Sequence, residues 1–272
     1  MQYHGGVGFI VENVTFGIDV LDAALPRGVP RNSFIILCGD GGTGKSVFLV
    51  NIAYTFLKRG EQVIYVALDD GPHSIAALFK TFRIDIDKYI SERLFGIIDA
   101  FSFRLGPLKK PHPSVIREVN PKNLDQLVHT INDVIDEWKL VNKGLLIIDS
   151  LNEIFFQTEM ASAFEFVKTI RAIAAKARNI LTISSLHTPT QTYQEIAKTL
   201  EYMVDGFIEL RYEPRLMEIG IPLKQYIIRK MRGVPHHASW VPYVIAEDGI
   251  KMADIKKVKE LMESKVESEK SK

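Results

Sequence analysis

Apolar residues along this chain follow two patterns, one typical of buried strands and one typical of amphipathic helices. Short runs rich in Ile, Leu and Val recur, and longer segments between them place apolar residues three or four positions apart. Continuous apolar runs of this length are typical of strands that are covered on both faces. We therefore predict strands at residues 34–38, 63–68, 94–99, 145–149, 181–185 and 206–210.

Helical segments fill the gaps between these strands. The clearest are residues 47–58, which end before Gly60, residues 124–139, and residues 161–178, where "FEFVKTIRAIAAKAR" forms an apolar stripe. Regular alternation of strands and helices is typical of a parallel sheet with helices on both faces. The predicted fold class is α/β, with a mostly parallel twisted sheet flanked by helices.

The pattern changes after residue 211. The segments "KQYIIRKMRG" and "WVPYVIAEDGIKM" are typical of antiparallel strands, with Asp248 and Gly249 at a turn in the second segment. We expect these antiparallel strands to be added at the C-terminal edge of the sheet. Residues 104–123 are rich in proline and cations and lack a clear period, which predicts a surface loop or a binding lid.

The length of the chain and the character of its last residues indicate the domain organisation. A chain of 272 residues with 46% hydrophobic content can bury one large α/β core. Residues 254–272 begin with Ile255, Val258 and Met262 on one side of a short helix and then become almost wholly polar. We expect a single domain over residues 1–253 and a charged helix and tail over residues 254–272.

Charge and cysteine content narrow the classes of partner and compartment. The net charge of +1 gives no general reason to expect a nucleic-acid partner. Cys38 is the single cysteine, so no intramolecular disulfide can form, which is typical of a reducing compartment. The sequence shows neither a signal segment nor an uninterrupted apolar span, so we expect a cytoplasmic protein without a membrane partner.

The strongest chemical motif is "GDGGTGKS", which follows the first predicted strand and precedes a predicted helix. Its glycines allow the backbone N–H groups to turn inward around phosphate oxygens, and the positive end of the helix adds to the attraction. Lys45 is expected near the β- and γ-phosphates, and Ser46 is expected to offer its hydroxyl to magnesium. The predicted nucleotide-binding residues are Gly39, Asp40, Gly41, Gly42, Thr43, Gly44, Lys45, Ser46 and Val47.

Two further strands end in carboxylates. "GLLIIDS" places Asp149 at the end of an apolar strand, where it is predicted to hold magnesium with Ser46, and Ser150 is placed to assist its orientation. "VIYVALDDGPHSI" places Asp69 and Asp70 after another strand. Either carboxylate is a candidate base for orienting water, with Asp69 favoured, while Asp70 also suits the N-cap of the next helix.

In this order the motifs resemble the RecA-superfamily P-loop ATPases, and among them the single-domain, archaeal-type KaiC-like family. The resemblance covers almost the full length, from "FGIDVLDAALPRGVPRNSFIILCGDGGTGKS" through "VIYVALDD" and "LLIIDSL" to "MVDGFIELRY" and "RKMRGVPHH". It implies a RecA-like P-loop NTPase core that binds ATP or ADP with magnesium between the subunits of a ring, a homohexamer. It also implies ATP hydrolysis that regulates assembly or contacts with a protein signalling partner.

The resemblance assigns two cations to the neighbouring subunit's site and exposes one departure from the family. Lys230 and Arg232 of the KMRG stretch correspond to residues that reach a neighbour's triphosphate, although alone they suit an exposed edge strand. Active members carry a Glu-Glu pair where this chain has Asp69 and Asp70, so we expect slow turnover because aspartate reaches less far. After the fifth predicted strand, His187 is a candidate sensor of the γ-phosphate, and Gln191 is another.

Two alternative functions remain open at this stage. One is a DNA-binding recombinase paralogue related to RecA and RadA, which four cations between residues 104 and 117 favour; these are Arg104, Lys109, Lys110 and Arg117. The lack of a basic stretch interleaved with aromatic residues disfavours it. The other is a nucleotide-stabilised assembly module that does not hydrolyse ATP, which the short carboxylates favour.

Overall fold

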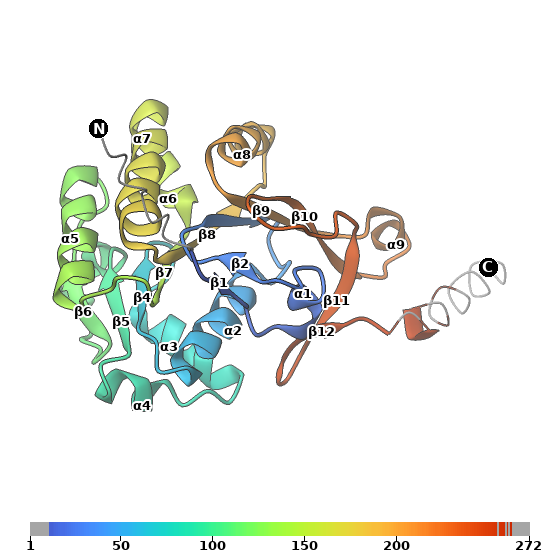
Figure 1. The fold of residues 1–272 in the computed structure, drawn as a ribbon, viewed down its shortest axis with the longest axis horizontal. Coiled ribbons are helices and arrows are strands. Elements are labelled where there is room, and N and C mark those ends of the chain that lie inside the picture. Colours follow the sequence, from blue (N-terminus) through green and yellow to red (C-terminus); the bar gives the residue numbers. More distant parts are fainter. Residues whose placement is uncertain (1–10, 255, 259, 261, 263–272) are drawn as a thin grey trace, which may run out of the picture.

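A ten-stranded sheet is the framework of the protein, seen edge-on near the centre of Figure 1. The structure, a computed structural model, describes residues 11–254, 256–258, 260 and 262. The strand order is β12-β11-β10-β9-β3-β8-β7-β4-β5-β6. The strands are β3 (Phe34–Gly39), β4 (Val63–Ala67), β5 (Phe95–Asp99), β6 (Val115–Glu118), β7 (Leu145–Asp149), β8 (Leu181–His187), β9 (Gly206–Tyr212), β10 (Lys224–Met231), β11 (Val241–Ala246) and β12 (Gly249–Met252).

Strands from β9 across to β6 run parallel, whereas β10, β11 and β12 are added antiparallel beside β9. This arrangement confirms the predicted fold class, including the antiparallel C-terminal edge. A short second sheet pairs β1 (Asn13–Val14) with β2 (Val29–Pro30). Within the described residues, no helix is both long enough and apolar enough to cross a membrane.

Helices cover both faces of the sheet. One face packs against α1 (Asp19–Asp22), α2 (Lys45–Lys58), α3 (Pro72–Thr81) and α4 (Ile86–Ser91). The other packs against α5 (Leu124–Glu137), α6 (Leu151–Gln157), α7 (Met160–Ile170), its π-helical continuation at Arg171–Lys176, and α8 (Gln191–Met203). A further helix, α9 (Pro214–Glu218), lies between β9 and β10 in the chain.

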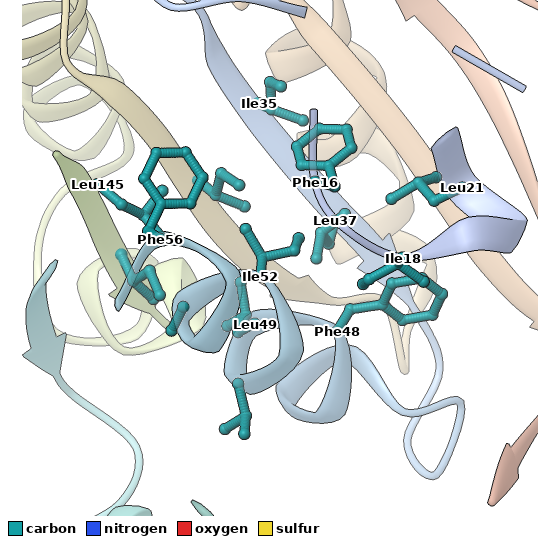
Figure 2. Close-up of a cluster of buried hydrophobic side chains, with 14 of the residues drawn as sticks. Phe16, Ile18, Leu21, Ile35, Leu37, Phe48, Leu49, Ile52, Phe56 and Leu145 are labelled. Carbon is teal, nitrogen blue, oxygen red and sulfur yellow. The ribbon is translucent and has the colours of Figure 1, made fainter. Parts of the chain in front are cut away.

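The core under α2 fixes the position of the phosphate loop. Figure 2 shows a core that α2 shares with β3, with Leu145 of β7 and with residues 16–21 before β2; its α2 side chains are Phe48, Leu49, Ile52 and Phe56. All four are almost fully buried, which stabilises the packing of the helix by about 1.5–3 kcal/mol per side chain. The loop that joins β3 to α2 is therefore anchored at both ends.

Three local features differ from the sequence-based expectation. The region 104–123 contains strand β6, which the sequence pattern does not reveal because the strand is only four residues long, between Pro113 and Pro121. Helix α2 begins at Lys45, two residues earlier than predicted, because Gly44 occupies the N-cap. The N-cap of α3 is Gly71, not Asp70, while Pro72 takes the first helical position as expected.

The domain division at residue 253 stays a prediction. Most of the tail 254–272, including Ile255, lies outside the described residues. The amide of Ala253, the last residue before this tail, donates to the carbonyl of Pro242 in β11.

A buried carboxylate ties the amino end of the sheet together. Asp205 accepts from the guanidinium of Arg171 at 2.7 and 3.0 Å and from the amide of Phe34 at 3.0 Å, and it pairs with Lys176 at 3.0 Å. Burial alone would raise the pKa of Asp205, but the hydrogen bonds from Arg171, Phe34 and Lys176 hold it below the ordinary value. The ionised form therefore stabilises the fold.

We expect Asp205→Asn to lower the free energy of unfolding by about 2 kcal/mol, less than for a fully buried pair because Arg171 and Lys176 are partly exposed. Because the folded pKa is depressed, the contribution is present above the unfolded pKa and is lost as pH falls through the folded pKa. Urea unfolding should show the difference near neutral pH and a smaller one below about pH 4.

Asp136→Asn is the matched control, because it breaks an exposed ion pair with Arg178. Its effect should stay within about 0.5 kcal/mol. Equal effects of the two substitutions at neutral pH would show that the Asp205 cluster does not stabilise the fold.

Candidate functional site

The phosphate loop lies at the carboxyl edge of the parallel strands, where β3 passes into α2 (Figure 1). Gly39 has φ 145°, and a Cβ there would lie 1.9 Å from the carbonyl oxygen of Leu210. Gly44, at the N-cap of α2, has φ 99°. Because side chains rarely adopt either conformation, glycine at these two positions lets the loop curl beside β9.

Lys45 fills the hollow of this loop. Its ammonium donates to the carbonyl oxygens of Gly39 at 2.7 Å and Asp40 at 2.8 Å, and the residue is 3% exposed. Burial lowers the pKa of Lys45 to about 8, against the attraction of nearby acidic groups that include Asp149 and Asp69. A buried cation held only by carbonyls fits an anionic phosphate ligand.

Two tyrosines, one at the end of β9 and one in β11, form hydrogen bonds with the backbone of the same loop. The hydroxyl of Tyr212 donates to the carbonyl oxygen of Gly42 at 3.0 Å, and that of Tyr243 donates to Thr43 at 2.6 Å. Tyr243 is fully buried, so its hydrogen bond holds the loop against β11. The sequence gives no local signal for these contacts because the partners are about 170 and 200 positions apart.

Asp149 ends β7 on the same face of the sheet as α2. One carboxylate oxygen accepts from Tyr65 at 2.5 Å, and the other accepts from the hydroxyl of Ser185. Burial raises the pKa of Asp149, and these two hydrogen bonds oppose the rise. Each oxygen keeps a further lone pair, so Asp149 and the half-buried Ser46 fit a water-mediated magnesium site.

Asp69 lies beside this position, beyond the end of β4. Its Oδ2 atom accepts from the hydroxyl of Ser150 and lies 3.9 Å from Nε2 of His187. Burial raises the pKa of Asp69, and the Ser150 hydrogen bond opposes the rise. Asp70 is exposed, and Gln191 donates to Glu195 in its own helix. The structure thus places Asp69 and His187 together, whereas Gln191 contacts a residue of its own helix.

Lys230 and Arg232 lie apart from the chain's own phosphate loop. Lys230 pairs with Phe207, near the start of β9. The phosphate loop begins at Gly39, which pairs with Leu210, three residues farther along β9. Lys230 donates to the last carbonyls of α8, including Glu201 at 2.5 Å, and Arg232 donates to Tyr202 at 3.3 Å. Since α8 and α2 cover opposite faces, these cations do not face Lys45.

Several residues around the site were not singled out from the sequence. Tyr65 and Ser185 contact Asp149, and Asn152 exchanges two hydrogen bonds with the backbone of His187 at 2.7 and 2.8 Å. A hydroxyl in the apolar runs "VIYVA" and "LTISSLH" is the signal that could have identified the first two. Because side chains alternate between the two faces of a strand, Tyr65 and Ser185 point to the same face of the sheet as Asp149, the face covered by α2.

Comparison with known proteins agrees with this geometry. The family model described as "ATPase: KaiC" matches residues 14–257. A UPF0273 protein of Pyrococcus furiosus is 26% identical over 242 residues, covering 89% of this chain and 94% of the relative. A UPF0273 protein of Methanocaldococcus jannaschii is 29% identical over 244 residues, covering 88% and 96%.

The fold has a counterpart among solved structures. The crystal structure of a KaiC-like protein from Pyrococcus horikoshii aligns with a TM-score of 0.68 at 22% identity, covering 90% of this chain and 100% of that one. This likeness concerns the fold, while the family match spans the phosphate loop, both strand-end carboxylates and the C-terminal strands. The chain belongs to the KaiC ATPase family.

Proposed function

We propose that this protein binds Mg-ATP on residues 39–47 and hydrolyses it slowly, with a neighbouring subunit completing the site. The convergence of Lys45, Asp69 and Asp149 at one edge of the sheet supports this proposal most directly. Lys45 interacts electrostatically with both carboxylates, and Ser150 joins the two acidic strand ends by its contact with Asp69. A triphosphate entering between them meets the cation first and the carboxylates at its far end.

Each member of the site has a distinct proposed role. The backbone N–H groups of the loop and the ammonium of Lys45 bind the β- and γ-phosphates. Ser46 and Asp149 would hold magnesium, which supplies neutralisation of phosphate charge when bound. Asp69 orients the attacking water and accepts its proton, with Ser150 and His187 limiting where the carboxylate lies.

The position of Asp69 also supports slow turnover. Its carboxylate is one methylene shorter than a glutamate and accepts a hydrogen bond from Ser150. A displacement of about 1 Å from the productive position can lower a rate on the order of 100-fold. Under this proposal, bound ATP persists long enough to regulate assembly or a protein partner.

The distant cations support a shared site. Lys230 and Arg232 are directed at α8, on the face opposite α2, so they serve the phosphate of another subunit better than their own. A cation supplied from a neighbour stabilises the charge on the transferring phosphoryl group. Because the donor and acceptor surfaces differ, the contact is heterologous, and we propose that it closes into a hexameric ring.

Ion pairing argues against the recombinase alternative. Of the four cations that favoured it, three are paired with carboxylates: Arg104 with Glu153, Lys109 with Glu118, and Arg117 with Glu137. Binding of a nucleic-acid backbone depends on cations that are free to replace counterions. The surface formed by residues 104–117 therefore offers little positive charge for that purpose.

The first test removes the loop cation. Lys45→Ala should weaken Mg-ATP binding by about 10- to 100-fold, because a charged hydrogen bond to phosphate is lost. Isothermal titration calorimetry measures this directly. Lys58→Ala, at the other end of α2, is the control and should bind as the parent does; equal affinities of all three proteins would exclude the phosphate role of Lys45.

The second test concerns the proposed base. Asp69→Asn should lower steady-state ATP hydrolysis by on the order of 10²- to 10⁴-fold while sparing nucleotide affinity, since the amide keeps the shape but accepts no proton. Asp69→Glu should raise the rate by extending the carboxylate toward the water. Unchanged turnover in Asp69→Asn would remove the base assignment, whereas Mg-ATP binding without hydrolysis by the parent protein would favour the assembly module.

The third test asks whether subunits share the site. Arg232→Ala should lower turnover, and mixing it with Asp69→Asn should restore part of the activity. In an equal random mixture, about one interface in four joins an intact Asp69 to an intact Arg232. Native mass spectrometry reports subunit exchange; a mixture that exchanges but stays as inactive as its components would contradict a shared site.

A further inference from the structure

The segment that follows β5 is built around one arginine. Asp99, 2% exposed, accepts at Oδ1 from the amides of Phe101 at 3.0 Å and Ser102 at 2.8 Å. This turn starts a 3₁₀ helix at Ser102–Leu108, which contains Arg104. The buried carboxylate therefore fixes the direction in which the segment leaves the sheet.

Arg104 is held on several sides. Its guanidinium lies 4.4 Å from the ring centroid of Phe103 and 5.5 Å from that of Phe101. It donates to the carbonyl oxygen of Phe101 at 3.3 Å and to the carboxylate of Glu153 in α6. Such fixation restricts a side chain that is ordinarily mobile, so the position of the charge is well defined.

The segment that follows β5 also packs against the loop that contains Asp69. A Cβ at Gly71 would lie 3.3 Å from the ring of Phe101 and 3.9 Å from the hydroxyl of Ser102. Arg104 also attracts the Asp69 carboxylate electrostatically. Movement of the Asp69 loop would therefore shift Arg104, both through the packing against Phe101 and through the attraction between the two charges.

Three side chains at the start of helix α6 make contacts that connect the helix to the nucleotide site. Ser150, just before the helix, donates to Asp69, Asn152 bonds the backbone of His187, and Glu153 accepts from Arg104. The helix ends near Phe156, which is 80% exposed. A change at the phosphate end thus acts on the start of a short rigid element whose far end lies at the surface.

We propose that Arg104 is a positioning residue that, through its ion pair with Glu153, couples nucleotide occupancy beside Asp69 to the orientation of helix α6. The inference rests on the proposed function for nucleotide binding, but it does not require hydrolysis. Arg104 holds the Asp69 loop and the first turn of α6 in register. Loss of either partner leaves the nucleotide bound but weakens its link to α6, because only the contacts of Ser150 and Asn152 remain.

A fluorescent reporter at the end of α6 tests this coupling. In a Phe156→Trp background, emission should differ between the Mg-AMP-PNP and Mg-ADP complexes, after subtraction of the parent signal from Trp138 and Trp240. Arg104→Gln should abolish most of that difference while calorimetry shows affinities within about twofold. In hydrolysis, kcat should fall roughly tenfold with KM unchanged, because the base is displaced rather than the phosphate site.

Three further variants separate coupling from simple structural damage. Glu153→Gln should give the same loss, and the double variant no greater loss, because both residues act through one contact. Arg104→Lys should restore part of the signal by restoring charge without the planar fork. Arg117→Gln breaks the exposed pair with Glu137 and should leave the reporter unchanged.

The failures of the two proposals can be told apart. If nucleotide binds but the reporter gives no difference, or if Arg104→Gln keeps the full difference, the coupling role is wrong while nucleotide binding stands. Additive losses in the double variant would likewise overturn it. If calorimetry shows that neither AMP-PNP nor ADP binds the parent protein, the proposed function fails first and the coupling with it.

Discussion

The burial of one ammonium beside two carboxylates is the interaction on which the rest of the site depends. Lys45 has lost most of its hydration and receives only carbonyl oxygens in exchange, while Asp69 and Asp149 are held close by strand ends. Such an arrangement is costly unless opposite charges lie near one another. Under the proposed function, bound phosphate and magnesium would balance both signs of charge at once, which would explain why the loop and the two acidic strands meet.

The sheet brings these charges together through side-chain phase. Tyr65, Asp149 and Ser185 come from three different parallel strands, yet all face α2 because alternate residues share a face. A shift of one residue in any strand would direct its side chain toward α5 to α8 instead. The aromatic core under α2 preserves that alignment, since the loop lysine begins the very helix that Phe48 and Phe56 anchor.

Features that depend on local sequence could be predicted, whereas features that depend on contacts between distant residues could not. The central strands, the phosphate loop and the end-of-strand position of Asp149 follow from short apolar runs and fixed spacing, so the sequence was sufficient. Strand β6 was missed because it is only four residues long and lies between Pro113 and Pro121, and the Tyr243 brace depends on a partner 200 positions away, which no local pattern encodes. The cap of α3 was misassigned to Asp70 because neighbouring Asp and Gly both suit an N-cap, and tertiary packing chose Gly71.

Under the shared-site proposal, the two ends of the sheet explain why a single chain would be an incomplete enzyme. The carboxyl edge presents the phosphate loop on the α2 face, whereas Lys230 and Arg232 lie toward the opposite edge and cap the last carbonyls of α8. A neighbour's triphosphate would therefore compete with a helix C-terminus for the two cations. Under the shared-site proposal, forming the interface releases the end of α8, and nucleotide state is thereby coupled to the helix as well as to assembly.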